Sequence, residues 1–468
     1  MRHAARRGRD RRAGAAVIGA ALLGLGCGAP KAEEAPRPNV VFILIDTLRA
    51  DRLSSYGYSR PTTPNLDAFA KDALLFEQAR SQAACTFPSV NSMLTSRWPT
   101  HFFGQPKNRI GIPEGLPALP EILGAFGYRS IAVSASPIVR KSQSPFNVHG
   151  GYDRGFEIFD ESCFNRRADC LNRRANRYLK QAAGPLFLYL HYQDVHSTYA
   201  PPSPWREKFL PPGPTGRPVR DWALAGNPQP VLSSLLGDGP KVEPTPHEIE
   251  TLSALYDGEL AYLDSQLGEL FAILKARGLL DRSIVVIASD HGEEFMEHGR
   301  VLHCETQFDT SIRVPLIVRL PGGGRKGRIA SPVENLDLVP TIVDYLGIDP
   351  GLPFEGKSLR PLIETGRAIH PTTESVQYTF RSTTDGRAKL IFDSAKPPGS
   401  VGRFALYDLL GDPTEQRDLL TADPETYRRL RLRLETRLKA AEGDLSAAVT
   451  LDAARESERS LKALGYLQ

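Results

Sequence analysis

The chain has 468 residues, of which 41% are hydrophobic and 24% are charged, and its formal net charge is +4. This is the composition of an ordinary globular protein, and the length suffices for one large α/β domain with a smaller one. Six Arg and one Asp lie within residues 1–12, so without them the net charge falls to −1. The rest of the chain has no basic surplus, and we expect no nucleic-acid partner.

Residues 1–36 differ from the rest of the chain. An Arg-rich start is followed by an apolar stretch at 13–26, then by Cys27 and a polar segment, which is the order of an export signal. Residues 17–27 resemble a bacterial lipoprotein signal, and the apolar stretch is shorter than the ~20 residues that span a bilayer. We therefore expect 1–36 to be an export or lipoprotein signal and linker. The protein would be an exported lipoprotein, anchored to the membrane by lipid in the periplasm or at the cell surface.

Apolar β-rich runs alternate with helical patterns through residues 37–345. The runs lie at 39–45, 130–134, 186–192, 283–289 and 314–319, and the helical patterns at about 64–80, 117–126 and 248–277. This alternation predicts an α/β fold with a doubly wound, mostly parallel sheet covered by helices on both faces. In the 248–277 pattern, apolar residues recur every three or four positions, so one stripe of that helix should pack on the sheet.

Two segments interrupt or follow this pattern. Residues 201–246 contain twelve of the 38 Pro, which predicts a long insertion that is either a substrate wall or a disordered linker. After about 345, short β-prone pieces at 374–380, 388–392 and 404–409 precede a helical pattern near 425–441. We expect a catalytic α/β domain at 37–345 and a small C-terminal α+β subdomain at 346–468.

Two of the five Cys lie close together in a loop-like segment. Cys163 and Cys170 could form a small disulfide in an exported protein, and two free thiols are the alternative.

Two of the apolar runs end in metal-ligating side chains. The run at 40–45 is followed by Asp46, and the run at 286–289 by Asp290 and His291. For Asp290 and His291 alone, an ordinary polar loop is the alternative. Because chemistry in α/β enzymes collects at the carboxyl ends of strands, the two runs together predict one divalent metal site.

Thr86 precedes a Pro that can occupy the first turn of a helix. A hydroxyl at such a helix start faces the positive end of the helix dipole, where anions are stabilised. A Thr hydroxyl is a poor nucleophile near neutral pH, and coordination to a divalent ion is a route to its alkoxide. Beside a metal held by Asp46, Asp290 and His291, Thr86 would be a competent nucleophile; a simple N-cap is the alternative.

At this point the sequence resembles the sulfatase family of the alkaline-phosphatase superfamily. The matching segments are 42–57, 86–97, 127–133, 191–202, 289–299, 313–317, 335–341, 406–409 and 464–467. The resemblance implies a large doubly wound domain followed by a small one. It also implies a metal site made by Asp46, Thr86, Asp290 and His291.

The resemblance implies roles for two further histidines, and one metal ligand of the family is replaced in this chain. His196 and His303 correspond to catalytic contacts with the non-bridging oxygens of the ester. Thr47 stands where many sulfatases have a second metal-binding Asp. Asp194, His196 and His303 could hold a second metal, and hydrogen bonds to substrate oxygens are the alternative. The metal could be Ca, Mg, Mn or Zn, with one ion expected and a second as the alternative.

The departures from the family bear on the reaction. Sulfatases mature a Cys in a Cys-x-Pro-x-Arg motif to formylglycine, whereas here Thr86 stands in that register and Cys85 lies one residue early. We therefore expect no formylglycine and interpret Cys85 as a small buried residue. A Lys and a His that would grip sulfate are also missing from the stretch at 133–139.

The sequence therefore predicts a metal-dependent hydrolase that cleaves sulfate or phosphate esters by in-line attack of Thr86. The substrate would be an anionic ester of a glycan, lipid or small molecule. Two alternatives remain open. One is a phosphodiesterase or phosphotransferase acting on a cell-envelope polymer or lipid headgroup. The other is a non-catalytic lipoprotein that binds anionic glycans.

Overall fold

The computed structural model describes residues 37–102, 111–143, 147, 150–164, 167–181, 184–212 and 244–445. The predicted signal and linker at 1–36, most of the insertion at 201–246 and the motif at 464–467 lie outside the described residues.

The main sheet has eight strands in the order β11-β2-β10-β7-β1-β6-β4-β5. The strands are β1 (Asn39–Ile45), β2 (Leu74–Phe76), β4 (Arg129–Ser134), β5 (Ile158–Asp160), β6 (Leu186–Tyr192), β7 (Ser283–Ala288), β10 (Leu316–Arg319) and β11 (Gly327–Ile329). Only β10 runs antiparallel to its neighbours, β7 and β2. The predicted fold class, a mostly parallel α/β sheet, is confirmed.

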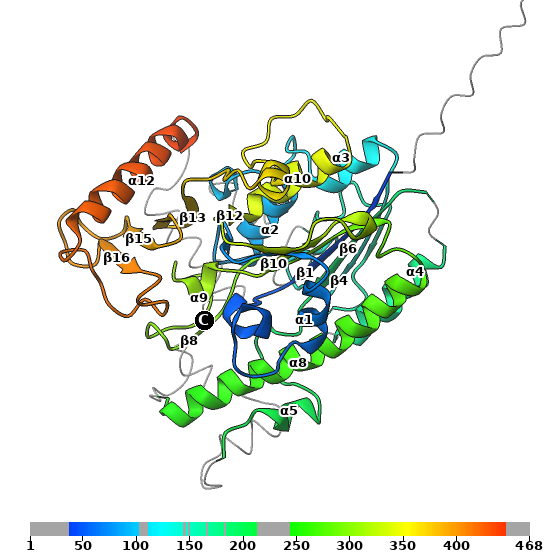
Figure 1. The fold of residues 1–468 in the computed structure, drawn as a ribbon, viewed down its shortest axis with the longest axis horizontal. Coiled ribbons are helices and arrows are strands. Elements are labelled where there is room, and N and C mark those ends of the chain that lie inside the picture. The colour runs from blue at the N-terminus through cyan, green and yellow to red at the C-terminus, as the bar shows by residue number, and fades with distance from the viewer. Residues whose placement is uncertain are drawn as a thin grey trace, which may run out of the picture. The chain divides into compact units, whose positions relative to one another are not determined.

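Helices cover both faces of this sheet (Figure 1). One face carries α2 (Thr86–Thr95), α3 (Leu119–Ala125), α10 (Leu338–Tyr345) and α11 (Arg360–Thr365), and the other α1 (Pro64–Ala70), α4 (Ala168–Leu179) and α8 (Pro246–Ala276). All seven residues of β1 are buried. Successive side chains of a strand point to opposite faces, so a strand buried on both faces is a continuous apolar run.

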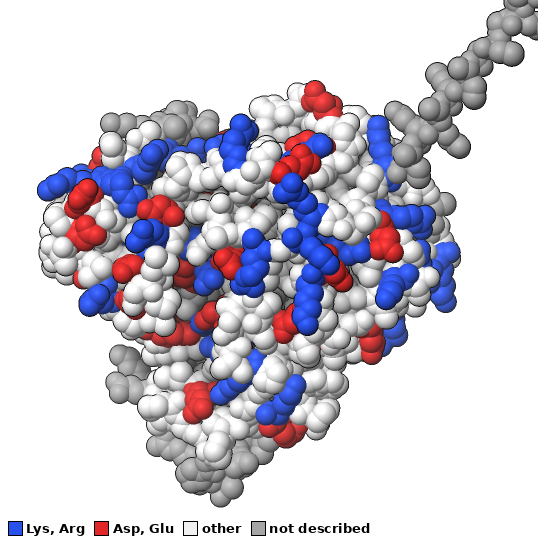
Figure 2. Space-filling view, in the orientation of Figure 1, with Lys and Arg blue, Asp and Glu red and all other residues white. Residues whose placement is uncertain are grey.

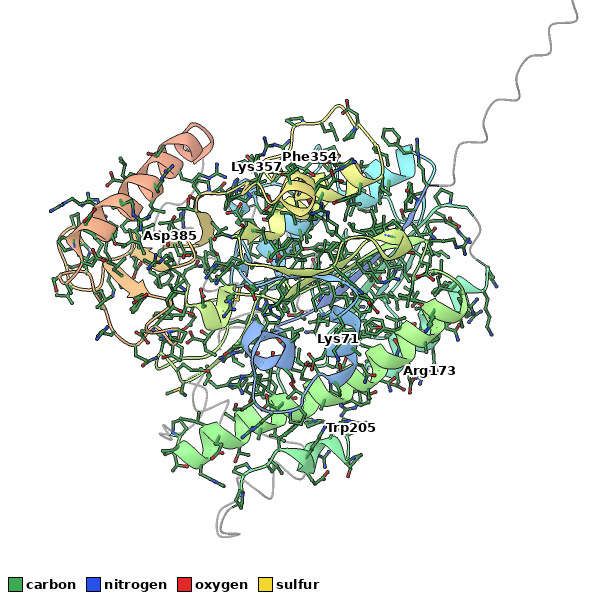
Figure 3. All side chains as sticks on the ribbon, viewed as in Figure 1. Lys71, Arg173, Trp205, Phe354, Lys357 and Asp385 are labelled. Atoms are coloured by element: carbon green, nitrogen blue, oxygen red, sulfur yellow. A yellow bond between two sulfur atoms is a disulfide. The ribbon has the colours of Figure 1, made fainter. Side chains whose placement is uncertain are left out.

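Helix α8 follows the predicted pattern closely. Thr245 caps its first turn by accepting a hydrogen bond from the Glu248 backbone N–H, and Pro246 occupies its first position. Its apolar stripe enters the core on the α1 and α4 side of the sheet. Trp205, in the short helix α5 (Trp205–Lys208), lies beside α8 (Figure 3), with its ring 5.2 Å from that of Tyr262. Their packing fixes the segment that follows the predicted active-site residue His196.

The helix predicted over residues 64–80 ends early. It stops at Ala70, and the chain turns into β2 and then β3 (Ala79–Arg80), which pairs with β12 (Val333–Glu334). The prediction is therefore wrong for the second half of this segment. A short apolar run such as Leu74–Phe76 suits a buried strand as well as a helix, and the available sheet edge decides between them.

The C-terminal part contains an antiparallel sheet, β13 (Thr373–Gln377), β14 (Phe380–Thr384), β15 (Ala388–Asp393) and β16 (Phe404–Asp408), packed against α12 (Pro424–Leu445) (Figure 1). The three predicted β-prone pieces and the closing helix are present. Buried Lys389 of β15 pairs with Asp309 at 2.9 Å and with Glu415 at 2.5 Å. Asp309 begins α9 (Asp309–Ile312), so the pair of Lys389 with Asp309 joins the C-terminal sheet to the short helix before β10. The boundary at residue 345 stays a prediction.

Short 3-10 helices and a small ribbon complete the described chain. They are η1 (Ala50–Arg52), η2 (Ser54–Tyr56), η3 (Pro99–His101), η4 (Pro321–Gly323) and η5 (Asn335–Asp337), with the ribbon β8 (Glu294–Phe295) and β9 (Val301–Leu302). On the face drawn in Figure 2, Lys and Arg side chains are interspersed with Asp and Glu. Among the described residues, no helix combines the length and apolar character that crossing a membrane requires.

Candidate active site

The carboxyl ends of two paired strands bring the predicted metal ligands together. β1 and β7 are parallel neighbours, with Leu44 opposite Ala288. Asp46 comes one residue after β1, and Asp290 and His291 follow β7, so all three leave the sheet at the same edge. Each of the three side chains is fully buried. The sequence prediction that these strand ends form one site agrees with this geometry.

These three side chains form a group that could hold a metal ion, with their ligand atoms within 4.8 Å of one another. Nε2 of His291 lies 3.7 Å from Oδ1 of Asp46 and 3.5 Å from Oδ2 of Asp290. Within the described part of the chain, both carboxylate oxygens of Asp46 and Oδ2 of Asp290 have no hydrogen-bond partner. Buried carboxylate oxygens without partners are costly, and a cation among them would remove that cost.

The tautomer of His291 suits a metal ligand. Its Nδ1 lies 2.9 Å from the Gly292 carbonyl oxygen, which can only accept, so Nδ1 carries the proton. Nε2 therefore presents its lone pair toward the two carboxylates. Gly292 is required here, because a Cβ at this position would lie 2.0 Å from the Thr310 carbonyl oxygen. The close backbone approach fixes the loop that carries His291.

The electrostatics of the group favour a cation. Burial, followed by the charge of Asp46, raises the pKa of Asp290 to about 7. Burial also raises the pKa of Asp46, but the contact with His191 and then the other imidazoles nearby outweigh it and hold that pKa below its usual range. Burial lowers the pKa of His291, so its ring stays neutral. The raised pKa of Asp290 thus reflects its burial and the negative charge of Asp46, a repulsion that a metal ion between the two carboxylates would offset.

Thr86 is the first residue of α2, and Cys85 is its N-cap in an extended conformation. The Oγ1 of Thr86 lies 3.1 Å from Nε2 of His291, the same nitrogen that faces the two carboxylates. Ser89, one turn along α2, donates to the Asp290 carbonyl oxygen at 2.6 Å. Thr86 is thus placed against the predicted metal ligands, and its side chain does not cap the helix.

The two predicted catalytic histidines lie next to this group. The His303 ring is 4.4 Å from that of His291 and 5.1 Å from that of His196. Nδ1 of His303 lies 2.8 Å from the Glu293 carboxylate, and Nδ1 of His196 lies 2.7 Å from the Ser197 carbonyl oxygen. Because a carbonyl oxygen can only accept, Nδ1 of His196 carries a proton.

Asp194 does not join His196 and His303. Its Oδ1 accepts a hydrogen bond of 2.9 Å from the Ala168 backbone N–H at the start of α4, and burial raises its pKa to about 7. No metal-capable group among the described residues contains Asp194. Asp194, His196 and His303 therefore do not meet as a metal-capable group among the described residues, and Oδ1 of Asp194 is engaged at the start of α4.

Thr47 also turns away from the predicted ligands. It has a left-handed backbone (φ 55°), and its hydroxyl donates to the Val195 carbonyl oxygen at 3.0 Å. Its backbone N–H reaches Oδ1 of Asp290 at 3.3 Å. Thr47 therefore supplies no side-chain ligand and instead joins the loop after β1 to the loop that carries His196.

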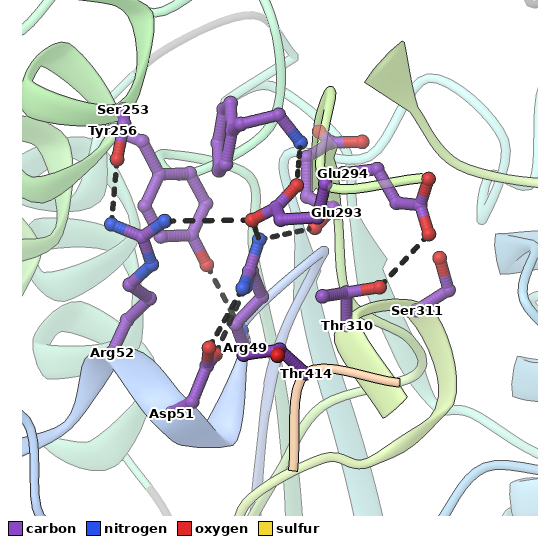
Figure 4. A network of polar contacts seen from close by, with 12 residues as sticks. Arg49, Asp51, Arg52, Ser253, Tyr256, Glu293, Glu294, Thr310, Ser311 and Thr414 are labelled. Carbon is purple, nitrogen blue, oxygen red and sulfur yellow. Dashed lines mark hydrogen bonds and ion pairs between the residues drawn. The ribbon is translucent and has the colours of Figure 1, made fainter. Parts of the chain in front are cut away.

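Arg49 joins the loop after β1 to the loop after β7 through hydrogen bonds and ion pairs (Figure 4). Its guanidinium donates to the Glu293 carbonyl oxygen at 2.9 Å and pairs with Asp51 at 2.7 Å and Glu297 at 2.6 Å. The Tyr256 hydroxyl, from α8, accepts from the Arg49 backbone N–H and donates to the Thr47 carbonyl oxygen, both at 2.9 Å. The loops that carry Asp46 and Asp290 are therefore joined by a network of buried polar contacts.

Both pairs of described cysteines form disulfides. Cys163 and Cys170 are bonded, so the small disulfide considered from the sequence is present. Cys85 is buried as expected, but it is bonded to Cys304. This disulfide joins the residue before Thr86 to the residue after His303. The sequence reasoning missed it, because nothing in a single sequence pairs two positions that are 219 residues apart.

His191 is the main site residue that the sequence reasoning missed. It lies in β6, which is the other neighbour of β1, and its Nε2 is 3.4 Å from Oδ2 of Asp46. A polar residue within the apolar run at 186–192 was the available signal.

A second group, Glu334, Asp337 and His370, also meets the distance criterion for a metal. Here the carboxylates already have partners: Asp337 contacts Nε2 of His370 at 2.9 Å and accepts from the Lys357 backbone N–H at 2.8 Å. Its contacts are those of a structural ion pair between Asp337 and His370, with no need for a metal.

Known proteins match this chain along most of its length. The family model described as Sulfatase matches residues 38–348, and the model described as N-sulphoglucosamine sulphohydrolase, C-terminal, matches residues 297–444. The chain is 25% identical to an "Ulvan-active sulfatase" of Formosa agariphila, over 81% of this chain and 78% of that protein. It is 21% identical to an "N-acetylglucosamine-6-O-sulfatase" of Bacteroides thetaiotaomicron, over 86% of each.

The fold is shared with solved structures. A phosphonate monoester hydrolase of Agrobacterium radiobacter superposes with a TM-score of 0.68 at 21% identity, covering 87% of this chain and 96% of that one. The architecture is therefore common to proteins named for sulfur esters and to proteins named for phosphorus esters.

Proposed function

The chain belongs to the sulfatase family of ester hydrolases, and on that premise we propose that it cleaves a sulfate or phosphate ester through Thr86 with a divalent metal. The observation that carries this proposal is the position of the Thr86 hydroxyl. It lies at the start of α2 and contacts Nε2 of His291, beside carboxylate oxygens of Asp46 and Asp290 that have no partner among the described residues.

The residues fit a divalent cation. Asp46, Asp290 and Thr86 offer oxygens and His291 a nitrogen, a donor set that suits Mn, Mg or Ca at least as well as Zn. When bound, such a cation supplies Lewis-acid chemistry that lowers the pKa of a hydroxyl and offsets negative charge. We expect one ion, because the residues predicted to hold a second one do not come together.

The chain's own residues account for the remaining steps. Oγ1 of Thr86 attacks sulfur or phosphorus in line, and the N-terminus of α2 favours the negative charge that grows there. His196 and His303 lie beside His291, where one of them can contact the ester oxygens and the other can protonate the leaving alcohol. Water or an acceptor alcohol then releases the group from Thr86.

Two observations favour the alternative of a phosphodiester or phosphoryl-transfer reaction. Thr86 stands in the position of the formylglycine precursor, and the neighbouring Cys85 is in a disulfide with Cys304. Residues 135–139, directly after β4, contain no Lys or His. Ser134 donates to the Val139 carbonyl oxygen, and Ser136 accepts from the Ile138 N–H, so these side chains close their own turn. The Lys and His that would bind sulfate are therefore missing from residues 135–139.

The substrate class that we propose is an anionic ester of a glycan, in line with the names of the two sulfatase relatives, with lipid and small aryl esters as alternatives. We also propose that the protein is an exported lipoprotein. The signal-like residues 1–36 support this, as do two disulfides, which persist mainly in oxidising compartments.

The test compares aryl sulfate, aryl phosphate, phosphodiester and phosphonate monoester hydrolysis by metal-free protein reloaded separately with Mn²⁺, Mg²⁺, Ca²⁺ and Zn²⁺. Wild type should turn over at least one ester, and Thr86→Ala should lower its kcat/KM by about 10³-fold or more. Thr86→Ser, which keeps the hydroxyl, should retain part of the activity. Full turnover by Thr86→Ala would exclude Thr86 as the nucleophile. A folded protein that binds no metal and cleaves none of these esters would favour the non-catalytic, glycan-binding alternative.

A further inference from the structure

A buried relay of two side chains reaches Asp46 from the side opposite to His291. Tyr189 and His191 lie on β6, the strand that pairs with β1 on the side away from β7. The Tyr189 hydroxyl is 3.0 Å from Nδ1 of His191, and Nε2 of His191 is 3.4 Å from Oδ2 of Asp46. His191 and Asp46 are fully buried, and Tyr189 is 1% exposed.

The contacts of His191 favour a proton on Nε2. If Nε2 were unprotonated, its lone pair would face a carboxylate oxygen at 3.4 Å in a buried site, which is repulsive. With the proton on Nε2, Nδ1 must accept, and the Tyr189 hydroxyl can donate to it. Burial raises the pKa of Tyr189 well above its usual value, so the hydroxyl keeps its proton. The relay therefore runs from the Tyr189 hydroxyl, which donates to Nδ1 of His191, to the Nε2–H of His191, which faces Oδ2 of Asp46 across 3.4 Å.

His191 is not itself in the metal-capable group. The ligand atoms of Asp46, Asp290 and His291 all lie within 4.8 Å of one another, and His191 is not part of that group. The two oxygens of Asp46 thus face two imidazoles: Oδ1 faces His291 and Oδ2 faces His191. The separation of 3.4 Å is longer than an ideal hydrogen bond, and Nε2 of His191 has no other partner among the described residues.

We propose that His191 is a positioning residue that holds Asp46 in its metal-binding rotamer, and that Tyr189 sets the His191 tautomer for this role. The inference rests on the metal site of the proposed function and assigns it a support beyond the ligands themselves. A buried carboxylate with two unpartnered oxygens could otherwise rotate toward any nearby donor. Groups that hold metal ligands in place typically contribute 10- to 100-fold in metal affinity or activity.

The variants isolate the N–H of His191 that faces Asp46. His191→Leu removes it, whereas His191→Gln restores an N–H near the position of Nε2. Tyr189→Phe removes only the hydroxyl that fixes the tautomer. Tyr192→Phe is the matched control, because Tyr192 is also buried on β6 and its hydroxyl bonds to Asn172, away from the metal ligands.

The measurement is the dissociation constant for Mn²⁺ alone, from the free Mn²⁺ signal in electron paramagnetic resonance during titration of metal-free protein. We expect His191→Leu to raise this constant by about 10- to 100-fold, Tyr189→Phe to raise it less, and His191→Gln to stay within about threefold of wild type. Melting temperatures are recorded for all variants. The control Tyr192→Phe should bind Mn²⁺ as wild type does, whatever its melting temperature.

Two results would overturn the inference: unchanged Mn²⁺ affinity in His191→Leu and Tyr189→Phe, or equal losses of affinity in His191→Gln and His191→Leu. The second would mean that ring volume matters and the N–H does not. A wild-type protein that binds no Mn²⁺ would instead contradict the proposed metal site itself. If Mn²⁺ binds to wild type but no ester is cleaved, the proposed reaction fails while the role of His191 is still measured.

Discussion

Removing the Cys85–Cys304 disulfide should destabilise the protein more than removing Cys163–Cys170. In the chain-entropy description, a cross-link stabilises by restricting the unfolded chain, and the effect grows with the length of the closed loop. The two bonds close sequence separations of 219 and 7 residues. These separations correspond to about 5 and about 2 kcal/mol of unfolding free energy. We therefore expect a difference of about 3 kcal/mol between the two variants.

The variants are the pairs Cys85→Ala with Cys304→Ala and Cys163→Ala with Cys170→Ala, which leave no free thiol and bury no hydroxyl. The measurement is the free energy of unfolding from urea titrations of metal-free protein. Removing the long-range bond should also lower kcat/KM for the best ester at temperatures where the variant is still folded. The reason is that this bond joins the neighbours of Thr86 and His303.

Equal losses of stability for the two pairs would refute the loop-length reasoning and would point to native-state strain or residual structure in the unfolded chain. A large loss of stability with unchanged kcat/KM would mean that the bond holds the fold but does not align the active-site residues.

Two further predictions concern a buried acid pair and the start of the chain. Burial, and then the charge of Asp194, raises the pKa of Glu259 to about 8, so the native state binds more protons than the unfolded state between about pH 4.5 and 8, and stability falls as pH rises through that window. At about 1.4 kcal/mol per pKa unit, Glu259→Gln should remove roughly 2–4 kcal/mol of this fall in unfolding free energy. The variant's melting temperature should therefore drop less than that of wild type from pH 5 to pH 8. An unchanged dependence of melting temperature on pH would contradict the prediction. The full-length chain should incorporate labelled palmitate and fractionate with membranes, and Cys27→Ser should do neither; label in the Cys27→Ser protein would exclude this anchor.

The fold and the core of the site could be predicted because parallel strands leave a strong signal. A strand that is buried on both faces must be apolar along its whole length, so β1, β6 and β7 stand out as runs. A side chain at the end of such a run is placed by the sheet, which is why Asp46, Asp290 and His291 could be predicted to lie together without coordinates. The Pro near Thr86 marked the start of α2 for a similar local reason.

The parts that could not be predicted depend on tertiary choices. The run at 74–76 was compatible with helix and strand, and an open sheet edge made it β2. Asp194 was a possible second-metal ligand with His196 and His303, but its Oδ1 accepts from the Ala168 N–H at the start of α4. The role of His191 depends on which strand lies beside β1, and the Cys85–Cys304 bond depends on which loop lies beside α2. Neither neighbour is encoded locally.

The strand order β7-β1-β6 separates the residues of the site from the connections between the strands. The side chains proposed to carry the reaction or to support it come from three adjacent central strands and the loops that follow them, from the start of α2 and, for His303, from the residue after β9. The long connections between these strands leave the sheet and come back to it. A connection can therefore be lengthened, shortened or exchanged while the reactive centre keeps its geometry. Such an architecture lets one ester-cleaving apparatus be retargeted to new alcohols by changing only the surrounding loops.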